Sequence, residues 1–343
     1  MEFREQVPLA PYTTFSIGGP ARWFADAASE EDVVEAVRFA RQRELPVFIL
    51  GGGSNLLVSD EGFPGLVLHI AIKGIEQLES IFRVAGGEDW NNFVSHVVDK
   101  SYAGIECLAG IPGTVGGTPV QNVGAYGQEV AETIAEVRVL DLSTMQFEDL
   151  TPQACGFAYR QSIFNSRERG RYIVTRVDYK LQKNGSPRIA YADLQKHFAS
   201  TASGPTLAEV SAAVRNIRHQ KGMLIVANDP DCRSAGSFFK NPVIAAEHYT
   251  RLAQRYGGEV PHYPALEGKI KLPAAWLLDQ AGLHKGYTLG LAGISSRHTL
   301  ALINKGQARA ADILALRDRI IAEVEAKFCI RLEPEPVILG PAI

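Results

Sequence analysis

The first 70 residues alternate short apolar runs with one amphipathic stretch. Residues 30–43 repeat apolar side chains one helical turn apart, which predicts a helix with a single buried stripe. Ser29, followed three residues later by Asp32, resembles a capping box at its start. Four apolar runs predict strands at residues 21–27, 46–50, 56–58 and 66–70. We therefore expect a small α+β unit here.

A second stretch follows with longer β-rich runs. A strand at 81–87 precedes a helix at 89–100 whose apolar residues share one face. Residues 134–142 and 171–181 are long runs rich in β-branched residues and predict strands. The low-complexity segment 199–206 predicts a linker that ends at the start of another helix.

The last third predicts mainly helices. Thr206 and Glu209 form the pattern of a second capping box. Apolar periodicity predicts helices at residues 207–221, 273–283 and 311–328, with Pro273 at the first helical position of the second, and residues 245–258 are expected to form an amphipathic turn. The remaining tail is limited by its prolines to an extended form.

Composition and charge exclude several classes of protein. The 343 residues carry 35 basic and 38 acidic side chains, a net charge of −3, and they contain no dense basic stretch, so nucleic acid is not an expected partner. The N-terminus has no apolar signal region and no window is long enough to span a membrane, so we expect a cytoplasmic protein without membrane insertion. The scattered cysteines Cys107, Cys155, Cys232 and Cys329 indicate neither a metal site nor a disulfide framework.

Two glycine-rich loops are the strongest chemical signal. The sequence GGGSNLLV at 51–58 follows a strand but leads into another strand, so it is neither a dinucleotide fingerprint nor a P-loop. Residues 109–127 hold six glycines with apolar residues between them. A tight turn explains the first loop equally well on its own, and a flexible linker is the alternative for the second. Together the loops suit a large anionic cofactor bound by backbone dipoles.

Eight ordered blocks resemble one enzyme family. They are PYTTFSIGGPA (11–21), LGGGSNLLV (50–58), GIPGTVGGTPVQNVGAYG (110–127), FAYRQSIFN (157–165), AGSFFKNP (235–242), KLPAAWLLDQAG (271–282), ALIN (301–304) and LEPE (332–335). This arrangement resembles the UDP-N-acetylenolpyruvoylglucosamine reductase (MurB) family over nearly the whole chain. The segment IAYADL (189–194) is similar to the subgroup with an extra tyrosine-bearing loop.

The resemblance implies an α+β fold with a two-subdomain FAD-binding region of the vanillyl-alcohol-oxidase (PCMH) type and a separate substrate-binding domain. We expect FAD-binding subdomains at 1–72 and 73–206, a substrate-binding domain at 207–330, and a tail at 331–343 that packs back on the FAD-binding region. The implied reaction uses NADPH to reduce FAD, which then reduces the enolpyruvyl ether of UDP-N-acetylglucosamine to UDP-N-acetylmuramate for peptidoglycan.

The implied chemistry needs three kinds of side chain. Hydride arriving at the terminal enolpyruvyl carbon leaves negative charge shared with the carboxylate, and the neighbouring carbon then needs a proton. The resemblance assigns stabilisation of the enolate to Arg160 and the catalytic acid Glu335, and its protonation to Ser237, with Glu333 as the alternative to Glu335. Pro336 and Val337 depart from the family pattern, in which a basic residue follows. Without the resemblance, Arg160 would be read as a surface ion pair and Ser237 as a turn or cap residue.

The resemblance also implies binding residues. For FAD these are Gly51, Gly52, Gly53, Ser54, Asn55, Leu56, Gly113, Thr114, Gly116, Gly117, Asn122, Gly124, Ala125 and Tyr126. For the sugar nucleotide they are Tyr191, Arg218, Lys221, Lys240, Asn241 and His298. Cations suit a diphosphate, although two basic residues at a helix C-terminus also interact with its dipole.

Two other functions stay open from sequence. One is an FAD oxidoreductase of the same fold acting on another small molecule, and the other is a flavin- or nucleotide-binding module without catalysis. We expect NADPH and the sugar nucleotide to bind in turn at the same flavin face, since no separate dinucleotide fingerprint is present. The sequence leaves the oligomeric state open and slightly favours a monomer.

Overall fold

A computed structural model describes residues 1–200 and 204–341, which form two compact units. Unit 1 contains Met1–Val7, Ala21–Gly53 and Pro64–Gln220, and unit 2 holds the remaining ranges, Pro8–Pro20, Ser54–Phe63 and Lys221–Ile343. The border between residues 53 and 54 divides the first glycine loop. The domain borders expected at residues 72, 206 and 330 stay a prediction.

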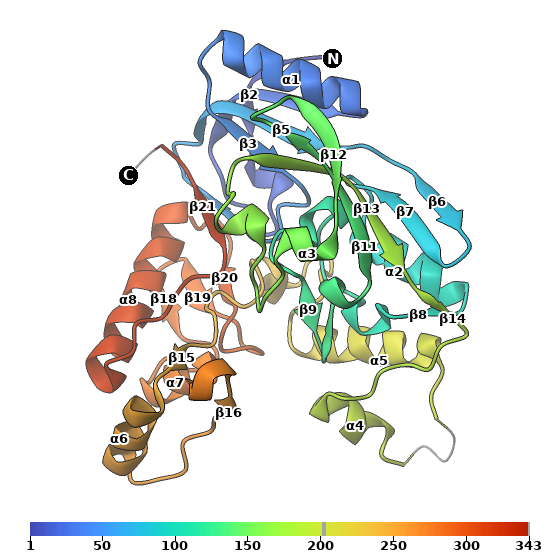
Figure 1. Ribbon diagram of the computed structural model, residues 1–343. Coiled ribbons are helices and arrows are strands. Elements are labelled where there is room, and N and C mark those ends of the chain that lie inside the picture. The colour runs from blue at the N-terminus through green and yellow to red at the C-terminus, as the bar shows by residue number, and fades with distance from the viewer. Residues whose placement is uncertain (201–203, 342–343) are drawn as a thin grey trace. The chain divides into compact units, whose positions relative to one another are not determined.

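A four-stranded sheet covered by one helix forms the first part of unit 1 (Figure 1). Its strands run in the order β1 (Arg4–Pro8), β2 (Pro20–Ala27), β5 (Phe63–Ile70) and β3 (Val47–Leu50), with β3 parallel to β5. Helix α1 (Glu30–Gln42) starts with the expected capping box. Its stripe of buried valines and alanines packs on the sheet in one apolar core, which explains the predicted period.

A five-stranded antiparallel sheet forms the second part of unit 1. The strand order is β12 (Gln146–Leu150), β11 (Ile134–Asp141), β13 (Tyr172–Lys180), β7 (Ile81–Ala85) and β6 (Ile75–Leu78). Every neighbouring pair is antiparallel. The two long central strands are those that the sequence predicts, whereas the two edge strands carry mostly exposed side chains and give no clear alternation.

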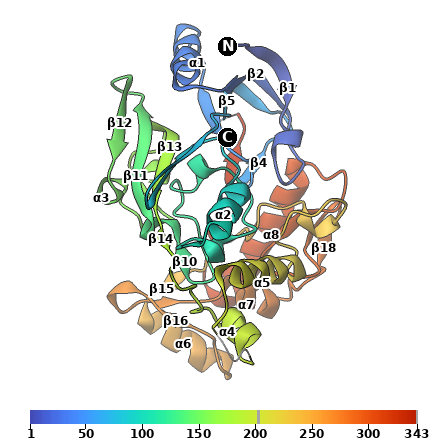
Figure 2. The ribbon, with the colours of Figure 1, turned by 90° about the vertical axis from the view of Figure 1, so that its right-hand side faces the viewer.

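Helices complete the core of unit 1. Helix α2 (Trp90–Asp99) buries the predicted apolar face, and α5 (Leu207–Gln220) lies beside it, as Figure 2 shows. The second capping box, before α5, is confirmed. Helix α4 (Ala192–Phe198) contacts α5 but was not predicted. The other short elements of unit 1 are β8 (Tyr102–Ala103), η2 (Glu106–Leu108), η3 (Val115–Gly117), β9 (Gly124–Ala125), β10 (Gln128–Glu129), η4 (Val130–Glu132), α3 (Pro152–Cys155), η5 (Ile163–Asn165) and β14 (Gln182–Lys183).

Unit 2 is built around its long last helix. Helix α8 (Ala310–Phe328) buries the predicted face against α7 (Ala274–Gln280) and a small antiparallel sheet. That sheet runs β18 (Thr288–Leu289), β19 (Ala292–Ile294), β20 (Leu302–Asn304). The proline before α7 occupies the N-cap position, one residue outside the first helical position expected for it.

A second small sheet and a parallel strand pair complete unit 2. The sheet runs β15 (Val243–Ile244), β17 (Ile270–Lys271), β16 (Tyr263–Pro264). The tail strand β21 (Val337–Leu339) pairs in parallel with β4 (Leu56–Val58). The other elements of unit 2 are η1 (Ala10–Tyr12), η6 (Pro230–Cys232), α6 (Ala246–Tyr256) and η7 (Leu266–Gly268).

Candidate active site

The two glycine loops meet backbone to backbone in unit 1. A Cβ on Gly52 would lie 2.6 Å from the Cα of Gly113, and one on Gly51 would lie 2.7 Å from the hydroxyl oxygen of Thr114. Gly52 therefore has to lack a side chain for the main chains to approach this closely. Such a cradle of bare backbone is what a large anionic cofactor requires.

Two amides of the second loop are used inside the protein. The N–H groups of Gly116 and Gly117 donate to the carbonyl oxygens of Gly86 and Thr114, at 2.8 and 3.0 Å. A Cβ on Gly116 would also lie 3.0 Å from the Gly86 oxygen, so this glycine serves close packing. Among the described residues, a Cβ on Gly117 would meet nothing nearer than the Thr114 hydroxyl at 4.0 Å. The open side of the loop is therefore at Gly117.

The end of the first loop belongs to unit 2 and contacts the tail. Ser54 is half-buried, and Leu56 is buried at the start of β4. Asn55 donates from Nδ2 to the carbonyl oxygen of Glu335 at 3.3 Å, and its own backbone carbonyl oxygen accepts from the Val337 N–H at 3.0 Å. A residue expected to bind the cofactor and the expected catalytic acid thus lie side by side.

A tight hairpin carries the last expected FAD residues. Gly124 and Ala125 form β9, which pairs with β10 across a turn at Tyr126 and Gly127. Both turn residues have positive φ, +49° and +83°, which is the signature of a type I′ turn. Gly53, the last residue of the first loop in unit 1, is also in the left-handed region, at +59°.

Arg160 lies in a second tight turn and contacts the first. Ala158 and Gln161 exchange backbone hydrogen bonds of 2.9 and 3.1 Å around it. Its φ is +55°, a conformation that costs a residue with a Cβ about 1–2 kcal/mol. Its Nη2 donates to the Gly124 carbonyl oxygen at 2.7 Å, and the guanidinium carbon lies 5.4 Å from the Tyr159 ring centre. One nitrogen is therefore anchored, which orients the planar fork that recognises carboxylates.

Arg218 places a buried positive charge near the same hairpin. Only 7 % of this residue is exposed, and its Nε donates to the Gly110 carbonyl oxygen at 3.0 Å. Burial lowers the pKa of its guanidinium, while a hydrogen bond with Tyr126 raises it. The Tyr126 ring meets the Tyr191 ring edge to face, with centres 5.3 Å apart. The structure thus brings Arg160, Arg218 and Tyr191 around one hairpin of unit 1.

In unit 2, the segment with Ser237 runs beside the tail. Ser237 bridges Ala301, and Phe239 bridges Pro334 in antiparallel pairing. The Glu335 N–H donates to the carbonyl oxygen of Phe238 at 2.8 Å. The hydroxyl and the carboxylate that the sequence analysis selects, nearly a hundred residues apart in the chain, therefore lie on adjacent segments.

The two candidate acids have different surroundings. Glu333 has a side chain 76 % exposed, and its carboxylate pairs with Lys240 at 3.3 Å. Glu335 is half-buried, with its backbone N–H bonded to the carbonyl oxygen of Phe238, the residue after Ser237. An exposed ion pair of this kind contributes little free energy, so Glu333 has the features of a surface residue.

The remaining expected contacts are placed by local structure. Asn241 accepts from the Ala274 N–H at 2.9 Å and so caps helix α7. His298 accepts at Nδ1 from the Leu300 N–H at 3.0 Å, an arrangement that assigns the ring proton to Nε2 when the ring is neutral. Its loop precedes the segment that bridges Ser237. Lys221, half-buried, is the first residue of unit 2 after the border.

Sequence reasoning missed one exposed row of side chains. Val243, Lys271 and Tyr263 are register partners across the second small sheet. Val243 and Tyr263 are 48 % and 55 % exposed, which is unusual for large apolar side chains. Val243 follows Asn241 by two residues, whereas Lys271 and Tyr263 reach the row from later in the chain. The only sequence signal was that Lys271 begins a block shared with the family.

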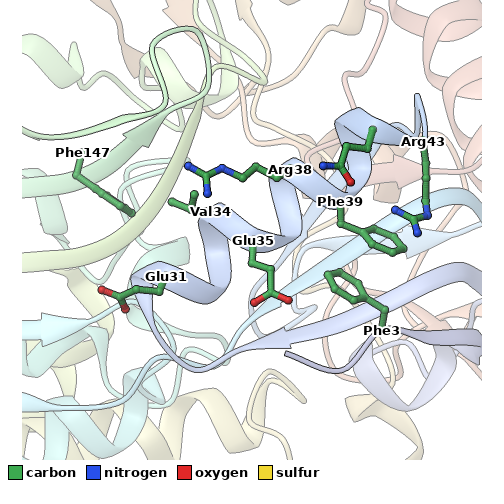
Figure 3. A pocket seen from close by; sticks show the side chains of 9 residues that line it. Phe3, Glu31, Val34, Glu35, Arg38, Phe39, Arg43 and Phe147 are labelled. Carbon is green, nitrogen blue, oxygen red and sulfur yellow. The ribbon is translucent and has the colours of Figure 1, made fainter.

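A surface hollow of unit 1 is separate from these residues. Figure 3 shows it along α1, where the rings of Phe3 and Phe39 stack with centres 3.8 Å apart and Arg43 lies over the Phe39 ring. None of its lining residues was expected to bind or react. Within residues 1–200 and 204–341, no cluster of histidine, cysteine and acidic residues could hold a metal ion, and no helix is both long and apolar enough to cross a membrane.

Comparison with known proteins identifies two family models. The FAD binding domain model matches residues 21–145, and the model for the C-terminal domain of UDP-N-acetylenolpyruvoylglucosamine reductase matches residues 228–339. The α+β, FAD-binding fold expected from the resemblance is therefore confirmed.

Full-length relatives agree with both models. The UDP-N-acetylenolpyruvoylglucosamine reductase of Thermobifida fusca is 44 % identical and covers 98 % of each chain. That of Chromobacterium violaceum is 40 % identical and covers 99 % of each. The crystal structure of the Thermus caldophilus enzyme is 29 % identical, with a TM-score of 0.69 over 99 % of this chain and all of that one. The expected family resemblance is confirmed over the whole length.

Proposed function

We propose that this chain, which belongs to the UDP-N-acetylenolpyruvoylglucosamine reductase family, uses NADPH to reduce UDP-N-acetylglucosamine enolpyruvate to UDP-N-acetylmuramate. The reaction is a step in bacterial peptidoglycan synthesis, and the protein is an FAD-dependent oxidoreductase. Its substrates are NADPH and a UDP-sugar, metabolites of the cytoplasm, where we place the enzyme. The observation that carries the proposal is the backbone pairing of residues 237–239 with the Glu335 segment, because it places the candidate proton donor and the candidate acid on adjacent segments.

The glycine cradle fits FAD. We assign the cofactor to the two loops that meet at Gly52 and Gly113, and to the hairpin that begins at Gly124. When bound, FAD supplies the two-electron carrier between NADPH and the substrate. The chain's contribution there is close, uncharged backbone, since the approach of the two loops excludes a side chain at Gly52.

Side chains of the protein stabilise the negative charge that hydride addition creates and supply the proton that completes the reaction. Arg160, anchored through Nη2, receives the substrate carboxylate and stabilises the negative charge that hydride addition creates. Ser237 holds the proton that the carbon beside the carboxylate takes up. Glu335, whose backbone bonds to the segment that carries Ser237, is assigned with Arg160 to stabilise the enolate. The overall reaction adds a hydride and a proton to one carbon–carbon double bond.

The nucleotide is assigned to the buried cation and its neighbours. Arg218 is a desolvated guanidinium and therefore suits a diphosphate, which it would bind with charge-assisted hydrogen bonds. Tyr191, 43 % exposed, offers a face and a hydroxyl beside it. Lys221, Lys240, Asn241 and His298 in unit 2 are assigned to the same substrate.

An anaerobic titration tests the reaction. The flavin absorbance should bleach on addition of NADPH and return on addition of the enolpyruvyl substrate. Bleaching without return would retain a flavin reductase and assign it a different substrate. A colourless protein that takes up no FAD would contradict the assignment of both glycine loops.

Substitution of Ser237 tests the proton donor. Ser237→Ala should slow flavin reoxidation by the substrate at least about a hundredfold, because general acid catalysis contributes about that much. Ser237→Cys keeps a donor and should lose less, while reduction by NADPH stays unchanged in both. Ser186→Ala, an exposed serine of unit 1, is the matched control. Equal losses for alanine and cysteine would rule out the donor role.

A further inference from the structure

Asn122 lies buried beside the turn that carries Arg160. It is 1 % exposed, and its φ of +45° is in the left-handed region. Its Nδ2 donates to the Glu129 carboxylate at 2.8 Å and to the Ala158 carbonyl oxygen at 3.0 Å, while its Oδ1 accepts from the Ala131 N–H at 3.2 Å. Two acceptors at one end and one donor at the other fix the orientation of the amide.

The bond to Ala158 reaches the base of the Arg160 turn. The same carbonyl oxygen accepts the Gln161 N–H that closes the turn. From the other side, Asn165 donates through Nδ2 to the Arg160 carbonyl oxygen at 3.1 Å. A long side chain in the left-handed region persists only where its surroundings over-determine the backbone. Two asparagine side chains supply that restraint here.

The bond to Glu129 reaches the other element that Arg160 contacts. Glu129 is the register partner of Gly124 in the β9–β10 hairpin, and Gly124 supplies the oxygen that accepts from the Arg160 guanidinium. Asn122 therefore joins, through its two N–H groups, the same turn and hairpin that Arg160 joins through its side chain. The distance between the two elements depends on this amide.

We propose that Asn122 is a positioning residue for Arg160 and that its side chain does not bind the cofactor. This inference rests on the proposed function, in which Arg160 receives the substrate carboxylate. A displacement of about 1 Å at a charge-stabilising group can cost about a hundredfold in rate. The expectation that Asn122 binds FAD is thus replaced by a role in the step after flavin reduction.

Asn122→Asp tests the proposal with almost no change of shape. The variant tolerates the left-handed backbone but replaces both donors with an acceptor, which faces Glu129 and the Ala158 oxygen. Reoxidation of the reduced flavin by the enolpyruvyl substrate should slow at least about tenfold, because Arg160 is displaced. Reduction by NADPH and the dissociation constant of FAD should change by less than about twofold, since neither needs the carboxylate contact.

Asn184→Asp is the matched control. Asn184 is exposed, has a φ of +53° and lies in the same unit, so it undergoes the same chemical change in the same kind of backbone. Both half-reactions of this variant should match those of the unchanged protein. Asn122→Asp should retain the flavin absorbance of this control, while its melting temperature should be a few degrees lower, because buried acceptors then face one another.

Three results would overturn the proposal. The first is weaker FAD binding with equal slowing of the two half-reactions, which would make Asn122 a cofactor ligand. The second is an unchanged reoxidation rate. If Asn122→Asp does not fold, Asn122→Gly, which also accepts positive φ, is tested by the same measurements. The third overturning result is that neither variant folds, which would assign Asn122 to general stability instead. If the unchanged protein is not reoxidised by the substrate, the proposed function fails independently of Asn122.

Discussion

Replacing Gly52 by alanine tests whether backbone contact between the glycine loops builds the cofactor site. The added Cβ would lie 2.6 Å from the Cα and 2.9 Å from the carbonyl carbon of Gly113, whereas ordinary contact begins at 3.4 Å. The two main chains must therefore separate by about 0.8 Å at the closest point. No side chain can rotate away to relieve this, because both contacts are to backbone.

The cost can be estimated from overpacking. Forcing an extra methyl group into a packed site costs about 1–3 kcal/mol, which corresponds to about 5–150-fold in an equilibrium constant. Without FAD the loops can move apart and relieve the contact. With FAD they must return to one geometry, so we expect the cost mainly in the dissociation constant of FAD.

The assay is titration of apoprotein with FAD, followed by flavin fluorescence, together with thermal melting of the apoprotein. Gly204→Ala is the control, because a Cβ there meets nothing within 4 Å among the described residues and its backbone is not left-handed. Gly52→Ala should bind FAD at least about fivefold more weakly than this control, with a similar apoprotein melting temperature. Equal FAD affinity of the two variants would refute the close-approach argument.

Two further predictions concern the protein as a whole. Arg171, which donates to Asp141 at 2.7 Å, holds the pKa of that buried carboxyl well below its usual range. A lowered folded-state pKa stabilises the protein above the unfolded-state pKa, and this stabilisation is lost on acidification. Asp141→Asn should therefore lower the melting temperature by a few degrees at neutral pH, and the difference from the unchanged protein should shrink below about pH 4. A difference that does not depend on pH would contradict the assignment. Burial raises the pKa of the Cys107 and Cys155 thiols to about 12, whereas Cys329 is exposed. A thiol reagent at about pH 8 should therefore label Cys329 within minutes and the buried cysteines only on unfolding. Rapid labelling of Cys107 in the folded protein would refute the burial argument.

Periodic helices and their caps could be predicted from sequence because their signals are local. Helix α1 begins and ends within one residue of the prediction, since its capping box and its apolar stripe lie within the same fourteen positions. Helix α8 was predicted from its apolar stripe alone, which repeats over most of its length. Helix α4 could not be found this way, because Leu194 is its single buried side chain and one position has no period. Strand β1 shows mixed exposure without alternation and was missed for a comparable reason.

The candidate site was predictable by resemblance but not in its connections. The motifs select Ser237 and Glu335, yet nothing local indicates that Phe239 bridges Pro334, because that register depends on how distant segments of unit 2 pack. Likewise, the sequence could not show that Glu333 pairs with Lys240 at the surface. The structure therefore supplies a physical reason to prefer the second glutamate that the motif alone did not contain.

Backbone conformation explains what remained hidden at Arg160. Turn rules assign glycine or asparagine to left-handed positions, and they predict neither an arginine at +55° nor a tyrosine at +49°. Both conformations are adopted against local preference. Tyr126 lies in the hairpin turn, and Arg160 lies in the neighbouring turn that contacts this hairpin. The surrounding structure holds conformations of this kind in place. From sequence Asn122 is only a turn residue, and its contribution to the Arg160 turn is visible only in the hydrogen bonds that its side chain makes. Left-handed residues other than glycine and asparagine also occur elsewhere in the chain, for example at Gln6 and Glu44, so the conformation alone does not mark a site. At Tyr126 and Arg160 it is informative because side-chain contacts join these two residues to the candidate substrate residues.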